Sequence, residues 1–220
     1  MRRIVTFHIL NPYVYYFSKY SSMGICVSLG NFTDFCYNFF IENINGLVNK
    51  IVSLPKKQTL FIAIDGRGGS GKSTLAEKLQ KELAHVTIVH LDDIVYPMRG
   101  ADRKKLLKQV IVPIKNSKAG KYQIYDYHIK KFTTWKEVKP EGIVIIEGVS
   151  ALHSDLFSSF DFTIWVECPA EIGMQRGVAR EMEQRGKDVT EIWAKYMDEE
   201  KKYIDDQNPQ QKADYVIMTN

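Results

Sequence analysis

Gly66 to Thr74 form a glycine-rich string, GRGGSGKST, whose spacing matches the pattern GxxxxGK[ST]. Its glycines allow backbone N–H groups to curl around a phosphate, and a lysine and a hydroxyl follow at its end. The candidate phosphate-binding residues are Gly66, Arg67, Gly68, Gly69, Ser70, Gly71, Lys72, Ser73 and Thr74. We expect Lys72 to reach the β- and γ-phosphates of ATP, Ser73 to offer its hydroxyl to Mg²⁺, and Thr74 to bond the α-phosphate side.

Two flanking patterns place this string between a strand and a helix. Residues 59–64, TLFIAI, form a short apolar run, and Leu75, Ala76, Leu79 and Leu83 recur at helical spacing after the loop. A strand, a phosphate loop and a helix in this order are typical of nucleotide-binding proteins.

Two neighbouring aspartates follow the next apolar run, residues 86–91, which we interpret as a buried parallel strand. Open α/β sheets bind ligands at the carboxyl ends of their strands, where Asp92 and Asp93 would lie. A carboxylate there could take the proton of an acceptor hydroxyl during phosphoryl transfer, and we expect Asp92 to be this base and Asp93 to contact the substrate. The alternatives are a helix cap or a ligand to a Mg²⁺-bound water, and Asp93 could be the base instead.

Glu147 ends a further apolar run, residues 143–146, in the manner of a Walker B strand. We expect Glu147 to hold Mg²⁺ through water or to polarise the acceptor, although an acid at this point could also cap the next turn.

A predicted helix beyond Pro169 carries Arg176 and Arg180 four residues apart, on one face. Such a pair could stabilise charge on the transferring phosphoryl group from a mobile lid, or belong to a solvated basic face. Further on, an apolar stripe at helical spacing predicts core packing and not a cofactor site; it comprises Val189, Ile192, Trp193, Tyr196, Met197, Tyr203 and Ile204.

Composition indicates one ordinary globular chain. The 220 residues are 45% hydrophobic and 25% charged, and the net charge of +4 is too small to indicate a nucleic-acid partner by itself. The three cysteines, Cys26, Cys36 and Cys168, include no CxxC pair, so neither a disulfide framework nor a zinc site is predicted and a cytoplasmic location is the default.

Positive charge is concentrated between Arg99 and Lys139, where 12 basic and 3 acidic residues give +9. The segment contains no recognisable nucleic-acid motif, and we interpret it as a solvated surface that an anionic substrate could approach. Tyr125 and His128 within it could line an acceptor pocket or pack on the surface.

The first 40 residues differ from the rest, with 11 of the 26 aromatic residues and no acidic residue before Asp34. His8, Asn11 and Pro12 interrupt the early apolar run well short of the roughly 18 residues of a membrane span, so no membrane partner is expected. The segment could be a signal or anchor, an extra packing element, or translated upstream sequence with the start at Met23 or later. We therefore expect an extension of unclear role over 1–40 and a P-loop kinase domain over 41–220.

Other nucleotide-binding classes lack support here. The sequence contains neither the Asn-Lys-x-Asp string that reads guanine nor the LSGGQ signature of transport ATPases. Small-substrate phosphoryl transfer is therefore favoured over a GTPase switch or a transport ATPase.

From about Ile41 onward the chain resembles the uridine kinase-like branch of P-loop kinases. The motifs that carry the resemblance are GRGGSGKST, HLDD, YDY, IIEGVSAL, DFTIWVECP and RGVARE. The resemblance implies a three-layer α/β/α fold of the P-loop NTPase type, with a mostly parallel five-stranded sheet and a helical lid. It also implies an ATP-dependent kinase, with Asp92 and Tyr125 on the acceptor side and Arg176 and Arg180 in the lid. We expect Mg²⁺ as the second cofactor, and a homo-oligomer is left open.

The acceptor region departs from that family. Nucleoside kinases of the group have Asp-x-Phe-Tyr after the strand, whereas Tyr96, which we expect to contact the substrate, comes one residue later here. No Asp-His-Pro string lies between Tyr96 and Tyr125. We therefore expect a kinase for a small metabolite, with a nucleoside such as uridine or cytidine first. The alternatives are a kinase for a nucleoside monophosphate, pantothenate or a phosphorylated metabolite, and a nucleotide-binding regulator or slow ATPase.

Overall fold

The computed structural model describes residues 6–10, 13–17, 44–94, 100–126, 129–186 and 188–219. The chain forms two compact units, Met1–Gly46 and Leu47–Asn220. In the first unit, β1 (Thr6–Leu10) and β2 (Tyr13–Phe17) form an antiparallel hairpin. Two predicted acceptor-side residues, Tyr96 and His128, lie outside the described residues.

The second unit is built on a five-stranded sheet in which every neighbouring pair of strands is parallel. Its strands, in the spatial order β4-β7-β3-β8-β9, are β4 (Val86–His90), β7 (Gly142–Glu147), β3 (Thr59–Gly66), β8 (Phe162–Glu167) and β9 (Tyr215–Met218). Parallel sheets are covered on both faces, which explains why their strands are continuous apolar runs in the sequence. The predicted α/β fold with a mostly parallel five-stranded sheet is confirmed.

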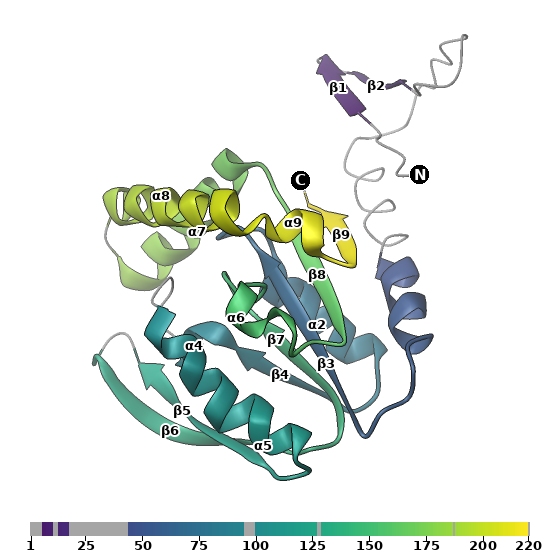
Figure 1. Ribbon diagram of the computed structural model, residues 1–220. Coiled ribbons are helices and arrows are strands. Elements are labelled where there is room, and N and C mark those ends of the chain that lie inside the picture. Colours follow the sequence, from purple (N-terminus) through teal and green to yellow (C-terminus); the bar gives the residue numbers. More distant parts are fainter. Residues whose placement is uncertain are drawn as a thin grey trace. The chain divides into compact units, whose positions relative to one another are not determined.

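Helices cover both faces of this sheet (Figure 1). Phe61 and Ala63 of β3 belong to the main core cluster, whereas Ile62 and Ile64 alternate with them toward the opposite face. The helices that follow β3 and β4 are α2 (Lys72–Glu82), α3 (Leu91–Ile94), α4 (Gly100–Leu106), the π-helical turn η1 (Leu107–Ile111) and α5 (Val112–Lys115). A helix over residues 44–52 precedes the sheet.

A hairpin that the sequence analysis did not predict follows α5. Its strands, β5 (Gly120–Asp126) and β6 (Lys131–Val138), pair antiparallel with an irregularity between Gln123 and Tyr125. Tyr122 is fully buried in the core cluster, while Trp135 is 60% exposed. The basic segment is therefore a helical run and a hairpin with one buried side.

Two long helices cross the carboxyl end of the sheet (Figure 1): α7 (Ala170–Arg185) and α8 (Thr190–Gln207). They pack closely, because a Cβ added to Gly177 of α7 would lie 2.0 Å from Cη2 of Trp193 on α8. The shorter helices α6 (Ser154–Phe157) and α9 (Pro209–Lys212) follow β7 and α8. Within the described part of the chain, no helix combines the length and the apolar character that a membrane crossing requires.

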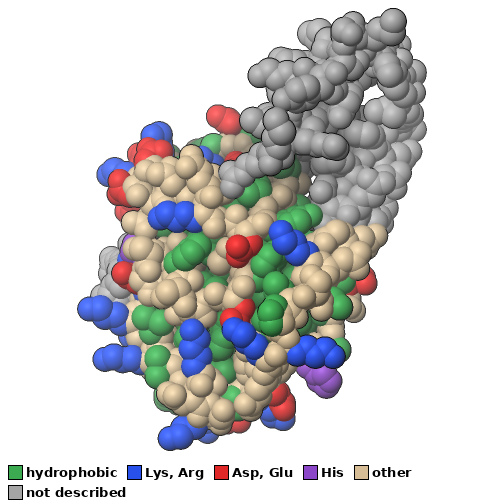
Figure 2. Space-filling view, turned by 45° about the vertical axis from the view of Figure 1, so that its right-hand side comes forward, with side chains coloured by type: hydrophobic (Ala, Val, Ile, Leu, Met, Phe, Trp, Pro, Cys, Tyr) green, Lys and Arg blue, Asp and Glu red, His purple; other side chains and the backbone are tan. Residues whose placement is uncertain are grey.

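The face drawn in Figure 2 carries charges of both signs, with basic side chains scattered among acidic and apolar ones.

Candidate active site

The carboxyl ends of β3, β4 and β7 bring the predicted chemistry together. Since these three strands are parallel neighbours, the phosphate loop, Asp92 and Glu147 emerge at the same edge of the sheet. A cavity of about 1190 Å³ opens there. The predicted site residues that line this cavity are Gly68, Gly69, Lys72, Ser73, Asp92, Tyr125, Glu147 and Arg180.

The phosphate loop is compact, and two of its glycines have no room for a side chain. A Cβ at Gly66 would lie 2.4 Å from the Val166 carbonyl oxygen, and at Gly69, where φ is +71°, it would lie 2.1 Å from the Gly173 carbonyl oxygen. The Nζ of Lys72 donates to the Arg67 carbonyl at 2.7 Å. Ser70 is fully buried, and its carbonyl accepts a hydrogen bond from Thr219 Oγ1. The backbone of Ser70 thus ties the loop to the C-terminal end of the described chain.

The first turn of α2 points its backbone N–H groups toward the loop. Gly71, the residue before the helix, has φ +92° and no side chain with which to cap these donors. Free N–H groups and the positive end of the helix dipole together form an anion site. Thr74 lies in this turn and is exposed.

A buried aspartate, Asp65, fixes the start of the loop. Its carboxylate is fully buried and accepts from the N–H groups of Gly66, Ser150 and Leu152 and from the hydroxyl of Tyr203 (2.6 Å). Burial raises the pKa of Asp65, although the hydrogen bonds from Tyr203, Leu152 and Gly66 and the charge of Lys72 oppose the increase. Asp65 thus joins the phosphate loop, the turn after β7 and α8.

Replacing Asp65 by alanine should lower the free energy of unfolding by about 3–5 kcal/mol, because four buried donors lose their acceptor. Chemical denaturation monitored by circular dichroism measures this change. The control is Asp198→Ala on the exposed side of α8, which should stay within about 0.5 kcal/mol of the wild type. Equal stability of the two variants would contradict a structural role for Asp65.

A chain of polar contacts links Ser73 and Glu147, which line the cavity, to His90. Ser73 Oγ donates to Glu147 Oε1 at 3.0 Å, and His90 Nδ1 lies 2.6 Å from the same oxygen. Burial alone would raise the pKa of Glu147, but the His90 hydrogen bond and the Lys72 charge outweigh it and lower the pKa. The hydrogen bond to Glu147 in turn raises the pKa of His90.

These oxygens suit Mg²⁺. The ion takes oxygen ligands, keeps several waters, and is commonly held by one or two side chains together with substrate phosphates. Ser73 and the ionised Glu147 supply such a pair beside the loop. Among the described residues there is no cluster of three His, Cys, Asp or Glu side chains that could hold a metal by itself.

Asp92 and Asp93 start the short helix α3 and differ in their surroundings. Asp92 lines the cavity, whereas Asp93 lies 3.7 Å from Lys136 on β6. Although the Asp92 side chain is open to solvent in the cavity, protein surrounds it closely, and this desolvation together with the charge of Glu147 raises its pKa to about 6. Asp92 is therefore the better placed of the two to act as a base.

Two of the residues predicted for the acceptor side and the lid, Tyr125 and Arg180, lie at the cavity wall. Tyr125 lines the cavity and meets Phe132 edge-on, with ring centroids 5.2 Å apart. Arg180 lines the cavity, whereas the exposed Arg176 donates to Cys168 Sγ at 3.9 Å. The two lid arginines thus have different surroundings in this structure.

The predicted core stripe on α8 is wrong in part. Val189, Trp193, Tyr203 and Ile204 are buried, but Ile192 is 58% exposed. Four members, Ile192, Trp193, Tyr196 and Tyr203, line the cavity. The reason is that α8 packs against the phosphate loop. Some side chains of its apolar face therefore line the cavity, while others pack in the core.

Sequence reasoning assigned no role to three polar residues of the site: Asp65, His90 and Glu200. The sequence position of two of them could have indicated a role. Asp65 follows an apolar run immediately before the loop, and His90 lies near the end of the next apolar run, two residues before Asp92. Glu200 lies among charged neighbours on α8, and nothing in its sequence context distinguishes it.

Comparisons with known proteins agree with this geometry. The family model described as "Phosphoribulokinase / Uridine kinase family" matches residues 96–219. A uridine kinase of Staphylococcus aureus is 27% identical over 161 residues, which cover 64% of this chain and 77% of that protein. The solved structure of a possible uridine kinase from Bacillus stearothermophilus has a similar fold, with a TM-score of 0.61 and 22% identity over 80% of this chain and 98% of the other.

Proposed function

The chain belongs to the phosphoribulokinase/uridine kinase family, and from this premise we propose that it transfers the γ-phosphoryl group of ATP to a hydroxyl of a small metabolite, in the first place a nucleoside such as uridine or cytidine. One observation carries the proposal: a single cavity joins the phosphate loop to a carboxylate, Asp92, whose pKa is raised to about 6. Binding of phosphates on one side and proton removal on the other are the two requirements of a small-molecule kinase. The reaction takes place in the cytoplasm.

In the proposed reaction the loop amides and Lys72 hold the β- and γ-phosphates, and Asp92 accepts the proton of the acceptor hydroxyl. The acceptor oxygen forms a bond to the γ-phosphorus as the bond to the β–γ bridging oxygen breaks, and ADP leaves with that oxygen. Arg180 stabilises charge on the phosphoryl oxygens from α7, and Arg176 joins it when the lid closes.

Ser73 and Glu147 would hold Mg²⁺, which when bound supplies charge neutralisation at the β- and γ-phosphate oxygens. Glu147 is ready for this role because its pKa is lowered and it carries a negative charge at neutral pH. His90 keeps the carboxylate oriented through the 2.6 Å contact.

Replacing Glu147 by glutamine should raise the Mg²⁺ concentration that gives half-maximal ADP formation by roughly tenfold or more, because the charge that attracts the ion is lost. The amide oxygen can still accept from Ser73, so the site should keep its shape. Glu77→Gln, on the exposed side of α2, is the matched control. An unchanged Mg²⁺ requirement would contradict the metal assignment.

A nucleoside suits the acceptor side of the cavity because Tyr125 offers an aromatic ring to a base and Asp92 offers an acceptor to a ribose hydroxyl. The named relative, a uridine kinase, supports the same class. A second candidate, an acceptor that already carries a phosphate, is favoured by Arg103 and Lys130, which also line the cavity.

A panel of acceptors tests the proposal. ADP release from Mg²⁺-ATP is measured with uridine, cytidine, the other nucleosides, nucleoside monophosphates and pantothenate, with Lys72→Ala as the blank. We expect uridine or cytidine to stimulate release. Stimulation by a monophosphate alone would establish the second candidate, and no stimulation by any compound, with ATP binding shown separately, would favour a regulator or slow ATPase.

A further inference from the structure

One face of α8 follows the phosphate loop along the helix. Trp193, Tyr196, Glu200 and Tyr203 are spaced three, four and three residues apart, which places them on one side of the helix. Tyr203 donates to Asp65 at the start of the loop, and Glu200 accepts from the loop itself at Gly68. The helix therefore contacts the loop at several successive points.

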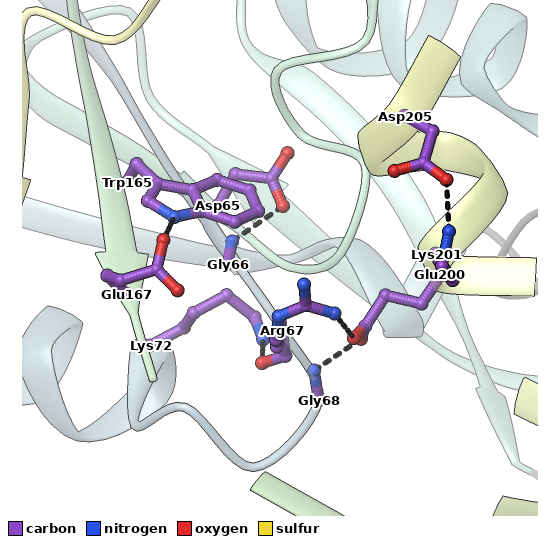
Figure 3. A network of polar contacts seen from close by, with 10 residues as sticks. All are labelled: Asp65, Gly66, Arg67, Gly68, Lys72, Trp165, Glu167, Glu200, Lys201 and Asp205. Atoms are coloured by element: carbon purple, nitrogen blue, oxygen red, sulfur yellow. Dashed lines mark hydrogen bonds and ion pairs between the residues drawn. The ribbon is translucent and has the colours of Figure 1, made fainter. Parts of the chain in front are cut away.

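Glu200 contacts the loop with its charged end. Its side chain is almost fully buried, and its carboxylate accepts from the Gly68 N–H at 2.5 Å and lies 3.4 Å from Nη1 of Arg67 (Figure 3). Lys72 Nζ, which donates to the carbonyl of Arg67, lies on the same short stretch of chain (Figure 3). One buried carboxylate thus fixes an amide and a guanidinium next to the lysine expected to hold the phosphates.

Packing around Gly68 limits how the loop can move. A Cβ added at Gly68 would lie 2.9 Å from Trp193 Cζ3 and 3.0 Å from Tyr196 Cε1. On the neighbouring residue, Gly69, a Cβ would meet the Gly173 carbonyl of α7. The rim of the loop is therefore held between α7 and α8, and Glu200 provides its charged anchor.

We propose that Glu200 is a positioning residue for nucleotide binding: by fixing the Gly68 amide and the Arg67 guanidinium, it holds the rim of the loop so that the later amides and Lys72 face the phosphates. This inference rests on the proposed function, since it concerns the same nucleotide site. If the loop is ordered before ATP binds, the binding free energy is not reduced by the entropic cost of ordering it.

The same contact is chemically compatible with the opposite effect, in which Glu200 weakens nucleotide binding. A carboxylate on a loop amide could act as a stand-in for phosphate that ATP must displace, in which case removing it would strengthen nucleotide binding. The two roles predict opposite signs, so binding measurements separate them.

The test measures ATP and AMP binding by isothermal titration calorimetry for the wild type, Glu200→Ala, Glu200→Gln and the control Asp198→Ala. We expect Glu200→Ala to weaken ATP binding roughly tenfold, because a fixed charge-assisted contact is lost, and to weaken AMP binding less, because AMP makes fewer loop contacts. Glu200→Gln should recover part of the loss, since its amide oxygen can accept from Gly68. Asp198→Ala should bind both nucleotides like the wild type.

Thermal unfolding of each variant accompanies the titrations. Tighter ATP binding by Glu200→Ala would overturn the proposal in favour of the stand-in role. Wild-type ATP affinity in Glu200→Ala, or weakening that is equal for ATP and AMP and follows only a lowered Tm, would overturn it in favour of a purely structural role. These readouts need no acceptor, so a failure of the proposed kinase activity would be seen separately, as wild-type ATP binding without phosphoryl transfer.

Discussion

Lys72→Ala should lower kcat/KM for phosphoryl transfer by about 100- to 1,000-fold, because the variant lacks the charge that meets the β- and γ-phosphates as negative charge develops in the transition state. The Lys72 ammonium donates to the Arg67 carbonyl at 2.7 Å, and the residue is only 8% exposed. The ammonium therefore lies within the phosphate loop. Steady-state kinetics with the acceptor identified by the panel measures the loss.

Lys81→Ala at the far end of α2 is the matched control, since it removes the same charge from the same helix at a distance from the loop. We expect its kcat/KM to remain within about twofold of the wild type. A loss of less than tenfold in Lys72→Ala would contradict the phosphate-loop mechanism.

Asp92→Asn should lower kcat by about 100- to 10,000-fold while ATP binding stays close to that of the wild type, because an amide cannot accept the proton of the acceptor hydroxyl. The wild type should also show an acidic limb in kcat/KM. The ionised form of Asp92 is the active one, and its pKa is raised to about 6, so activity should fall as the pH drops through about 6. The cause is desolvation of Asp92 and its repulsion from Glu147, both of which favour the protonated, inactive form.

Asp93→Asn is the matched comparison, because it makes the same substitution at the neighbouring residue. Because Asp93 lies against Lys136 and not on the cavity wall, we expect a smaller loss in kcat and an acidic limb at the same pH as in the wild type. A larger loss in Asp93→Asn than in Asp92→Asn would transfer the role of base to Asp93.

The parts of the fold that depend on local pattern were predictable. A buried parallel strand needs a continuous apolar run, and the runs before Gly66, Asp92 and Glu147 are such strands. Because parallel strands end at one edge of a sheet, their terminal residues had to meet, and the Ser73 to Glu147 hydrogen bond is the result. Sequence reasoning therefore succeeded where a motif lies at the end of a strand.

Features that depend on distant contacts were not predictable in this way. The β5–β6 hairpin was missed because β6 alternates little, being exposed along almost its whole length. Glu200 accepts a hydrogen bond from Gly68, which lies 132 residues earlier in the sequence. Helical periodicity cannot indicate which charged residue of a helix will point into a site. Ile192 and its neighbours fit a core stripe by spacing alone, although α8 directs part of that stripe at the cavity.

The most direct test of the central claim compares ADP and inorganic phosphate released from Mg²⁺-ATP, with and without the acceptor that the panel identifies. A kinase transfers the phosphoryl group to the acceptor, so we predict that ADP formation rises with the acceptor while free phosphate does not, and that Lys72→Ala abolishes the rise. Equal amounts of ADP and free phosphate, at a rate that no acceptor changes, would contradict phosphoryl transfer and identify the chain as an ATPase or nucleotide-binding regulator.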